Sequence, residues 1–329
     1  MTQFNWDDFR IQPDDITEFS GGLHRPECVL CTATGDMYVS HRARGVSRIA
    51  PDGKLTAMSS IAEIGGHELI PNGIAMLADG SFLIANIGET GGIWKLGRDG
   101  QLTPFLTEVD GQPLSAANFV TTDHQGRVWI TVSTTSSPRF KAYSPDVADG
   151  FVALVDERGA RIVADGLAFT NECRLGPDGA HLYVSETFGR RIRRFAVRPG
   201  GLGAGEVFTQ LGDGDFPDGC EFDEEGGLWV TSIVSNRLYR MDRDGKPSLI
   251  IEDSDPAFVA EVEAAVRERR MERDHFYTAR GKRLRNIASI AFGGPDRRTA
   301  YMGSLLGEVL YSFRSPVPGR EPIHWNYSR

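Results

Sequence analysis

Residues Thr170–Glu186 read TNECRLGPDGAHLYVSE: a short strand, a turn containing Asp-Gly, and a second strand rich in aromatic and β-branched residues. This phrase occurs six times along the chain. The other copies are PECVLCTATGDMYVS (26–40), PNGIAMLADGSFLIAN (71–86), ANFVTTDHQGRVWIT (117–131), PDGCEFDEEGGLWVTS (217–232) and ASIAFGGPDRRTAYMGS (288–304). Six copies of one hairpin indicate a repeat architecture.

The spacing of the copies identifies the repeat. Consecutive copies begin 45, 46, 53, 47 and 71 residues apart, and most continue into a further strand and turn. A four-stranded propeller blade needs this length. The sequence therefore predicts an all-β fold, a six-bladed β-propeller, as a single domain over residues 1–329. Residues 4–19 are expected to supply or brace the outer strand of the last blade.

The long last gap predicts a helical insertion before the last blade's inner strand. Residues 256–285 are rich in Ala, Glu and Arg and carry Phe258, Val262 and Val266 at helical spacing. The insert is either a solvated helix that covers a blade edge or a lid over the channel mouth. The lid interpretation arises because the insert leads directly into the sixth inner strand.

Composition limits the partners. The chain of 329 residues has a net charge of −9 and a pI near 5.4, with no basic run. The broad positive charge that nucleic acids and anionic membranes attract is therefore missing, so we expect neither of them as a partner. A small-molecule substrate is expected instead. The N-terminus lacks the pattern of a secretory signal, and no apolar stretch is long enough for a membrane span, so we expect a cytoplasmic protein.

The cysteines do not indicate a zinc site. Cys28 and Cys31 form a C-x-x-C motif, but no second pair follows at zinc-site spacing. A strand through this motif would point the two thiols to opposite faces. Buried, inert thiols are the prediction.

One position of the repeat carries side-chain oxygens in every copy. Aligning the copies on their turns places at the start of the six inner strands the residues Glu27, Asn72, Asn118, Asn171, Asp218 and Ser289. We call these six residues the axial ring, because inner strands line the channel of a propeller. Local backbone capping would also favour Asn, Asp and Ser, but it does not favour Glu.

The axial ring predicts a metal site. Two carboxylates among neutral amide oxygens suit a hard divalent cation. Ca²⁺ is preferred because the channel is roomy and the ligand set exceeds the needs of Mg²⁺, with Zn²⁺, Mg²⁺ and Mn²⁺ as alternatives.

The repeated phrases also resemble a known family. TNECRLGPDGAHLYVSET, PDGCEFDEEGGLWVTS and PECVL are similar to motifs of the SMP-30/gluconolactonase/LRE-like six-bladed propellers. This resemblance implies that Glu27, Asn171 and Asp218 hold the metal, and that Asn118 faces the metal or the substrate. Two positions depart from the family pattern: Ala116 replaces an Arg that binds sugar lactones, and Ala288 to Ala291 lack a His found in phosphotriesterase relatives.

The resemblance implies a metal-dependent hydrolase of the lactonase type. The cation would polarise the substrate carbonyl, and Asp218 is the catalytic candidate, either as general base or as nucleophile. Alternatives are an esterase or phosphotriesterase, a metal-dependent lyase on the same site, or a non-catalytic binding module.

Further candidates for substrate binding surround the ring. They are Asn72, Asn118 and Ser289 within it, and His24, His67 and Arg285 just before inner strands. The histidines could shuttle protons and Arg285 could meet a substrate carboxylate. For all three, the alternative is an ordinary solvated loop or helix-end residue.

Overall fold

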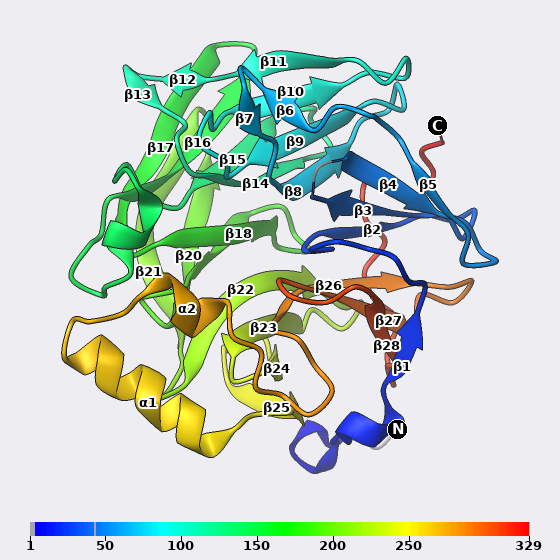
Figure 1. Cartoon of the computed structure of the whole chain (residues 1–329), viewed down its shortest axis with the longest axis vertical. Coiled ribbons are helices and arrows are strands. Elements are labelled where there is room, and N and C mark those ends of the chain that lie inside the picture. Colours follow the sequence, from blue (N-terminus) through cyan, green and yellow to red (C-terminus); the bar gives the residue numbers. More distant parts are fainter. Residues whose placement is uncertain (1–3, 43, 329) are drawn as a thin grey trace.

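The computed structural model describes residues 4–42 and 44–328. Six four-stranded antiparallel sheets are arranged around a central axis, in which each sheet is one blade (Figure 1). Inner strands of neighbouring blades contact one another all the way round, from β2 through β8, β14, β18, β22 and β26 back to β2. The predicted six-bladed β-propeller is confirmed.

Each blade runs from an inner to an outer strand. Blade 1 contains β2 (Val29–Cys31), β3 (Met37–His41), β4 (Gly45–Ile49) and β5 (Leu55–Ala57). Blade 2 contains β8 (Pro71–Met76), β9 (Phe82–Asn86), β10 (Ile93–Leu96) and β11 (Leu102–Leu106). Blade 3 contains β14 (Ala117–Thr122), β15 (Val128–Val132), β16 (Gly150–Asp156) and β17 (Gly159–Leu167).

The second half of the ring has the same order. Blade 4 contains β18 (Thr170–Leu175), β19 (His181–Glu186), β20 (Arg191–Arg198) and β21 (Gly201–Gln210). Blade 5 contains β22 (Asp215–Phe222), β23 (Leu228–Val234), β24 (Arg237–Met241) and β25 (Pro247–Glu252). Blade 6 contains β26 (Ile287–Gly293), β27 (Thr299–Ser304), β28 (Leu310–Arg314) and, from the N-terminus, β1 (Thr17–Phe19).

The N-terminal segment closes the ring as predicted. β1 pairs antiparallel with β28, with Glu18 opposite Tyr311. Upstream of β1, the Trp6 ring packs edge-on against Trp229, with centroids 5.6 Å apart, and lies beneath the guanidinium of Arg240. The first and last parts of the chain thus share one blade, which joins the two ends of the ring.

Short elements connect the blades. Two small hairpins pair β6 (Glu63–Ile64) with β7 (His67–Glu68), and β12 (Glu108–Val109) with β13 (Gln112–Pro113). Of the 3₁₀ turns in the described part of the chain, η1 (Trp6–Asp8) and η2 (Pro13–Asp15) precede β1, and η3 (Arg139–Ala142) lies between β15 and β16 within blade 3. No helix among the described residues is long and apolar enough to cross a membrane.

The predicted helical insertion is present between β25 and β26. It forms α1 (Pro256–Arg267) and the short α2 (Arg273–Phe276). Asp255 caps α1 by accepting hydrogen bonds from the backbone of Ala257 and Phe258, and Pro256 occupies the first turn, where it costs no hydrogen bond. Figure 1 shows α1 along the edge of the propeller and α2 nearer its inner strands.

The core consists of apolar side chains from facing sheets, and the cysteines belong to it. Cys28 and Cys31 are 1% and 2% exposed and pack in different clusters, as expected for opposite strand faces. Burial raises the pKa of both thiols above the ordinary range. The prediction of buried, unreactive thiols agrees with these surroundings.

Candidate active site

The axial ring residues are all buried, with exposed fractions between 2% and 4%. Four of them lie where the ladder of the inner strand is interrupted. Pairing skips between Pro71 and Ile74, between Ala117 and Phe119, between Thr170 and Cys173, and between Pro217 and Cys220. Such bulges turn a side chain away from the regular pleat, and here they release Asn72, Asn118, Asn171 and Asp218 from it.

The sixth blade differs by one residue. Its ladder skips between Ile287 and Ser289, so Ala288 is the residue left out and Ser289 itself pairs with Gly303. The Oγ of Ser289 nevertheless lies beside blade 1, because a Cβ on Gly303 would meet both this Oγ, at 2.7 Å, and the carbonyl of Glu27, at 3.0 Å. Ser289 therefore lies near Glu27 while it remains paired in the sheet, unlike the four residues that lie in bulges.

A chain of hydrogen bonds links one side of the ring. Arg25 donates from Nη2 to Asn72 Oδ1 at 2.8 Å, and Asn72 donates from Nδ2 to Asn118 Oδ1 at 3.2 Å. Asn118 in turn donates to Ser133 Oγ at 3.0 Å. The side-chain amide oxygens of Asn72 and Asn118 therefore each accept a hydrogen bond already, from Arg25 and from Asn72.

The other side of the ring presents oxygens that have no partner. Asn171 donates from Nδ2 to Thr187 Oγ1 at 3.1 Å, and Thr187 donates onward to the carbonyl of Pro217 at 2.9 Å. This arrangement fixes the amide so that Asn171 Oδ1 faces away from Thr187. Among the described residues, Asn171 Oδ1, Asp218 Oδ1 and Ser289 Oγ are buried oxygens without a hydrogen-bond donor, whereas Glu27 Oε2 has the guanidinium of Arg25 as its partner.

Buried acceptors without donors are costly and call for a ligand. Two carboxylates, one amide oxygen and one hydroxyl form a hard donor set of the kind that a divalent cation such as Ca²⁺ prefers. Within the described chain no three His, Cys, Asp or Glu side chains gather as a metal cluster. The residues present fit a hard cation.

Electrostatics at the ring favour the same ligand. Burial, and then the charges of Glu27 and Glu172, raise the pKa of Asp218 well above its usual value. Burial likewise raises the pKa of Glu27, although the guanidinium groups of Arg25 and Arg139 oppose the shift. It costs free energy to ionise two neighbouring buried carboxyls. A bound cation would offset that cost.

These shifts predict how stability depends on pH. A carboxyl with a raised pKa stays protonated in the folded protein at pH values at which the same carboxyl is ionised in the unfolded chain. The metal-free protein should therefore lose stability as the pH rises above the usual carboxyl pKa. Because Ca²⁺ favours the ionised form, the rise in Tm on adding Ca²⁺ should be larger at about pH 8 than at about pH 5. Differential scanning fluorimetry after chelation measures both, and an equal rise at the two pH values would contradict the prediction.

Two arginine side chains that act on the ring were not predicted from the sequence. Arg25 is 5% exposed, and its Nη1 lies 2.5 Å from Glu27 Oε2. Arg139, in η3, donates from Nη2 to the hydroxyl of Tyr277 at 2.8 Å. Arg25 could have been noticed because it stands two residues before Glu27, but Arg139 lies in a loop with no repeated pattern.

The three candidates outside the ring are not drawn into it. His67 is exposed on the β6–β7 hairpin, and its Nδ1 lies 3.0 Å from the carboxylate of Glu89. His24 is also exposed, and exposed Arg285 donates to the carbonyl of Gly281 at 3.2 Å. None of the three has a hydrogen bond or ion pair with an axial ring residue in the described structure, and their roles in substrate binding stay predictions.

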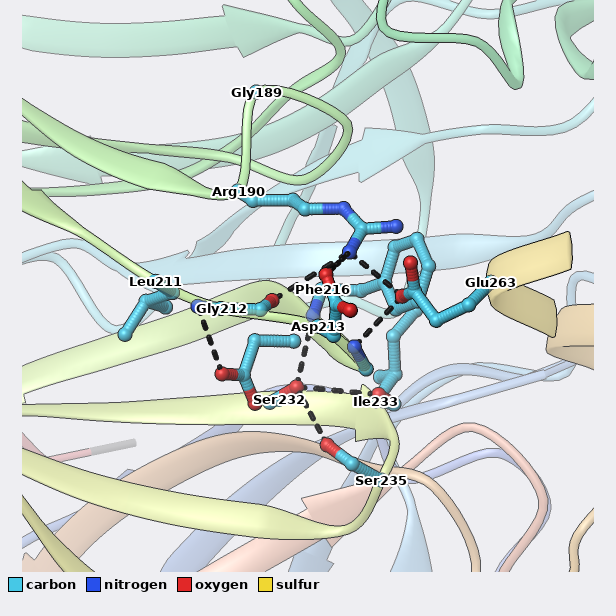
Figure 2. Close-up of polar contacts among 12 residues, drawn as sticks. Gly189, Arg190, Leu211, Gly212, Asp213, Phe216, Ser232, Ile233, Ser235 and Glu263 are labelled. Atoms are coloured by element: carbon cyan, nitrogen blue, oxygen red, sulfur yellow. Dashed lines mark hydrogen bonds and ion pairs between the residues drawn. The ribbon is translucent and has the colours of Figure 1, made fainter. Parts of the chain in front are cut away.

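The helical insert is held in place by a buried ion pair. Glu263, 7% exposed at its side chain, lies 2.6 Å from Arg190 Nη1 and accepts a hydrogen bond from Gly214 N at 2.7 Å (Figure 2). The same guanidinium lies over the ring of Phe216, 4.7 Å from its centroid. The insert also contributes Phe276, which packs against Phe216 and Phe188 in an aromatic cluster. The insert is therefore docked on blades 4 and 5 rather than solvated on all sides.

Replacing Glu263 tests this anchor. Glu263→Ala leaves the Arg190 guanidinium without its carboxylate, so the free energy of unfolding should fall by about 3 kcal/mol. Urea denaturation measures the loss, and limited proteolysis should show faster cleavage within 268–283. Glu261→Ala, an exposed position on the same helix, is the matched control. Equal stability of the two variants would remove the ion pair as the anchor.

One cavity, of about 180 Å³, lies away from the ring. Its walls come from the carboxyl-terminal parts of the inner strands, including Leu30, Met76 and Phe292, and from residues 320–324. Ring residues stand at the amino-terminal parts of the same strands and do not line it. The cavity therefore belongs to the opposite end of the channel.

Comparison with known proteins gives a family match over residues 59–252, to the model described as "SMP-30/Gluconolactonase/LRE-like region". Strictosidine synthase-like protein 13 of Arabidopsis thaliana is 28% identical over 167 residues, which is 47% of this chain and 37% of that protein. L-arabinolactonase of Azospirillum brasilense is 34% identical over 107 residues, 32% of this chain and 36% of that protein. The chain thus spans little more than a third of either curated relative.

Solved structures share the fold over nearly the whole chain. A calcium-binding protein, regucalcin, from Agrobacterium tumefaciens superimposes with a TM-score of 0.64 at 18% identity, covering 95% of both chains. At this identity the likeness concerns the architecture.

Proposed function

Because the chain belongs to the SMP-30/gluconolactonase/LRE-like family, we propose that it is a metal-dependent hydrolase that opens a lactone at the axis of the propeller. The observation that carries the proposal is the pair of buried, unpartnered oxygens on Asn171 and Asp218, which face the same channel as the buried carboxylate of Glu27. A relative named L-arabinolactonase supports the lactone as substrate class.

The proposed cofactor is a divalent cation, with Ca²⁺ preferred. Glu27, Asn171 and Asp218 would hold it, with Asn118 and Ser289 beside them; all offer the oxygen ligands that calcium takes. The calcium-binding relative of the same fold supports this choice. When bound, the cation would supply a Lewis acid that polarises a carbonyl.

The chain's own residues would do the rest. Asp218 would accept the proton of the attacking water through its carboxylate. Thr187 would keep the amide oxygen of Asn171 turned away from the strand by holding its nitrogen. The docked insert, including Phe276, would limit the entry of water, which is the lid interpretation.

A panel of lactones and esters assayed after chelation, with Ca²⁺, Mg²⁺, Zn²⁺ or Mn²⁺ restored, tests the proposal. Lactone hydrolysis that chelator abolishes and one of these cations restores is the expected result. Activity that chelator leaves unchanged, or no hydrolysis of any lactone with any cation, would overturn it.

A further inference from the structure

The cavity of about 180 Å³ at the far end of the channel is bordered by a segment near the C-terminus, residues 320–324. At one end of this segment the backbone N–H of Arg320 donates to the carbonyl of Phe222 at 2.9 Å. Just past its other end the carbonyl of Trp325 accepts a hydrogen bond from the backbone N–H of Ala33 at 2.7 Å. The segment is therefore tied to blade 5 and to blade 1, and it forms a fixed wall of the cavity.

The walls contributed by the inner strands are largely apolar and aromatic. Leu30, Met76, Phe119 and Phe292 line the cavity, and each is at most 5% exposed. Phenylalanine rings and a thioether both make favourable contacts with an aromatic ring. An apolar cavity of about 150 Å³ is large enough to bind benzene. The volume here therefore fits one aromatic ring with a small substituent.

The charged side chains of these walls are already paired. Arg174 donates from Nε to Glu221 at 3.1 Å, and its Nη2 lies 3.1 Å from Glu172. Arg127 and Asp123 pair with each other at 2.6 Å. An ionic ligand would lose its water in the cavity without gaining an unpaired opposite charge on these walls. The cavity therefore favours a neutral ligand.

Two polar side chains of the lining are available to a ligand. In the described part of the chain, the hydroxyl of Thr121 and the buried Nε2 of His324 have no hydrogen-bond partner. Burial, and next the charge of Arg174, lower the pKa of His324 to about 4, so the ring is neutral at pH 7. Buried polar atoms are rarely left without a partner. A hydroxyl on the ligand suits both side chains, because it can donate and accept.

We propose that this cavity is a second ligand site, which binds a small neutral phenol with its ring against Met76 and Phe119 and its hydroxyl bonded to Thr121 and His324. The apolar walls supply most of the contact area, and the two polar side chains select the hydroxyl.

The phenol site is separate from the axial ring. On β18, the fully buried Cys173 lies between Asn171 of the ring and Arg174 of the cavity wall. On β22, Cys220 lies in the same way between Asp218 and the cavity wall. The inference therefore goes beyond the proposed hydrolysis and does not depend on it.

Calorimetric titration of the whole chain with phenol and with toluene tests the site, because the two molecules have nearly the same shape and only phenol carries a hydroxyl. Both should show saturable binding. Thr121→Val and His324→Leu each remove one polar partner, so each should raise the Kd for phenol by about 3- to 10-fold and that for toluene by less than about twofold. Thr103→Val, at an exposed strand position, is the matched control and should change neither Kd.

A variant that fills the cavity locates the binding. Ala291 lines the wall and is 7% exposed, so Ala291→Leu should weaken both phenol and toluene by at least about tenfold. The phenol site stands if this happens and if Thr121→Val or His324→Leu weakens phenol alone.

Three results would overturn the phenol site. They are no saturable binding of either molecule, unchanged Kd values in Ala291→Leu, and polar variants that fail to weaken phenol relative to toluene. None of these measurements uses lactone turnover, so a failure of the proposed hydrolysis would leave their outcome unaffected.

Discussion

Asp218→Asn is expected to reduce kcat for lactone hydrolysis by about a thousandfold, because an amide cannot accept the proton of the attacking water. The amide oxygen can still ligate, so binding of Ca²⁺ should be weakened but measurable by calorimetry. The folded structure should persist, because Asp218 Oδ1 has no hydrogen-bond donor to lose in the described structure.

The matched control is Asp215→Asn on the same strand. Asp215 is also buried, but it lies 3.1 Å from Arg237 Nη1 and accepts a hydrogen bond from the Tyr239 hydroxyl. This variant should lose stability and keep most of its kcat. Turnover of Asp218→Asn close to that of wild type would remove Asp218 from the mechanism.

Glu27→Gln is expected to raise the Kd for Ca²⁺ by at least about 100-fold, beyond the 10- to 100-fold typical of residues that only support a ligand. The substitution removes one of two ring carboxylates and also leaves Arg25 without its anion. The positive charge of Arg25, no longer neutralised, would then repel the cation and weaken its binding further. Calorimetry on chelated protein gives the Kd.

Glu68→Gln serves as the comparison for Glu27→Gln. Glu68 also pairs with an arginine, Arg42, at 2.6 Å, but on the exposed hairpin away from the ring. Its substitution should change the Kd by less than about twofold, because exposed ion pairs contribute little. Unaltered affinity in Glu27→Gln would contradict the proposed ligand set.

The repeat in the sequence determined the fold and the depth of the ring. Strands alternate their side chains with a fixed period, and an Asp-Gly turn fixes where the two strands of a hairpin start. Aligning the turns therefore located Asn72, Asn118, Asn171 and Asp218, all of which the structure buries at bulges of the inner strands. In the sixth copy the alignment selected Ser289, whereas the residue left out of the strand pairing is its neighbour Ala288.

Only the tertiary structure decided which ring oxygens stay unpaired. Asn72 and Asn118 look like Asn171 in sequence, yet their oxygens accept hydrogen bonds from Arg25 and Asn72, which come from neighbouring blades. Local sequence carries no signal for such contacts, because they depend on how separate blades meet.

The same reason explains where the remaining predicted residues lie and why two others were not predicted. His67 and Arg285 stand close to inner strands in the chain, but their connecting segments carry them to the surface. Arg139 and Tyr277 are 138 residues apart and meet through a hydrogen bond at 2.8 Å. Periodic backbone geometry sets the strands and their register from local sequence, whereas the partners of a buried polar group are set by the packing of distant loops, which follows only from the closed ring.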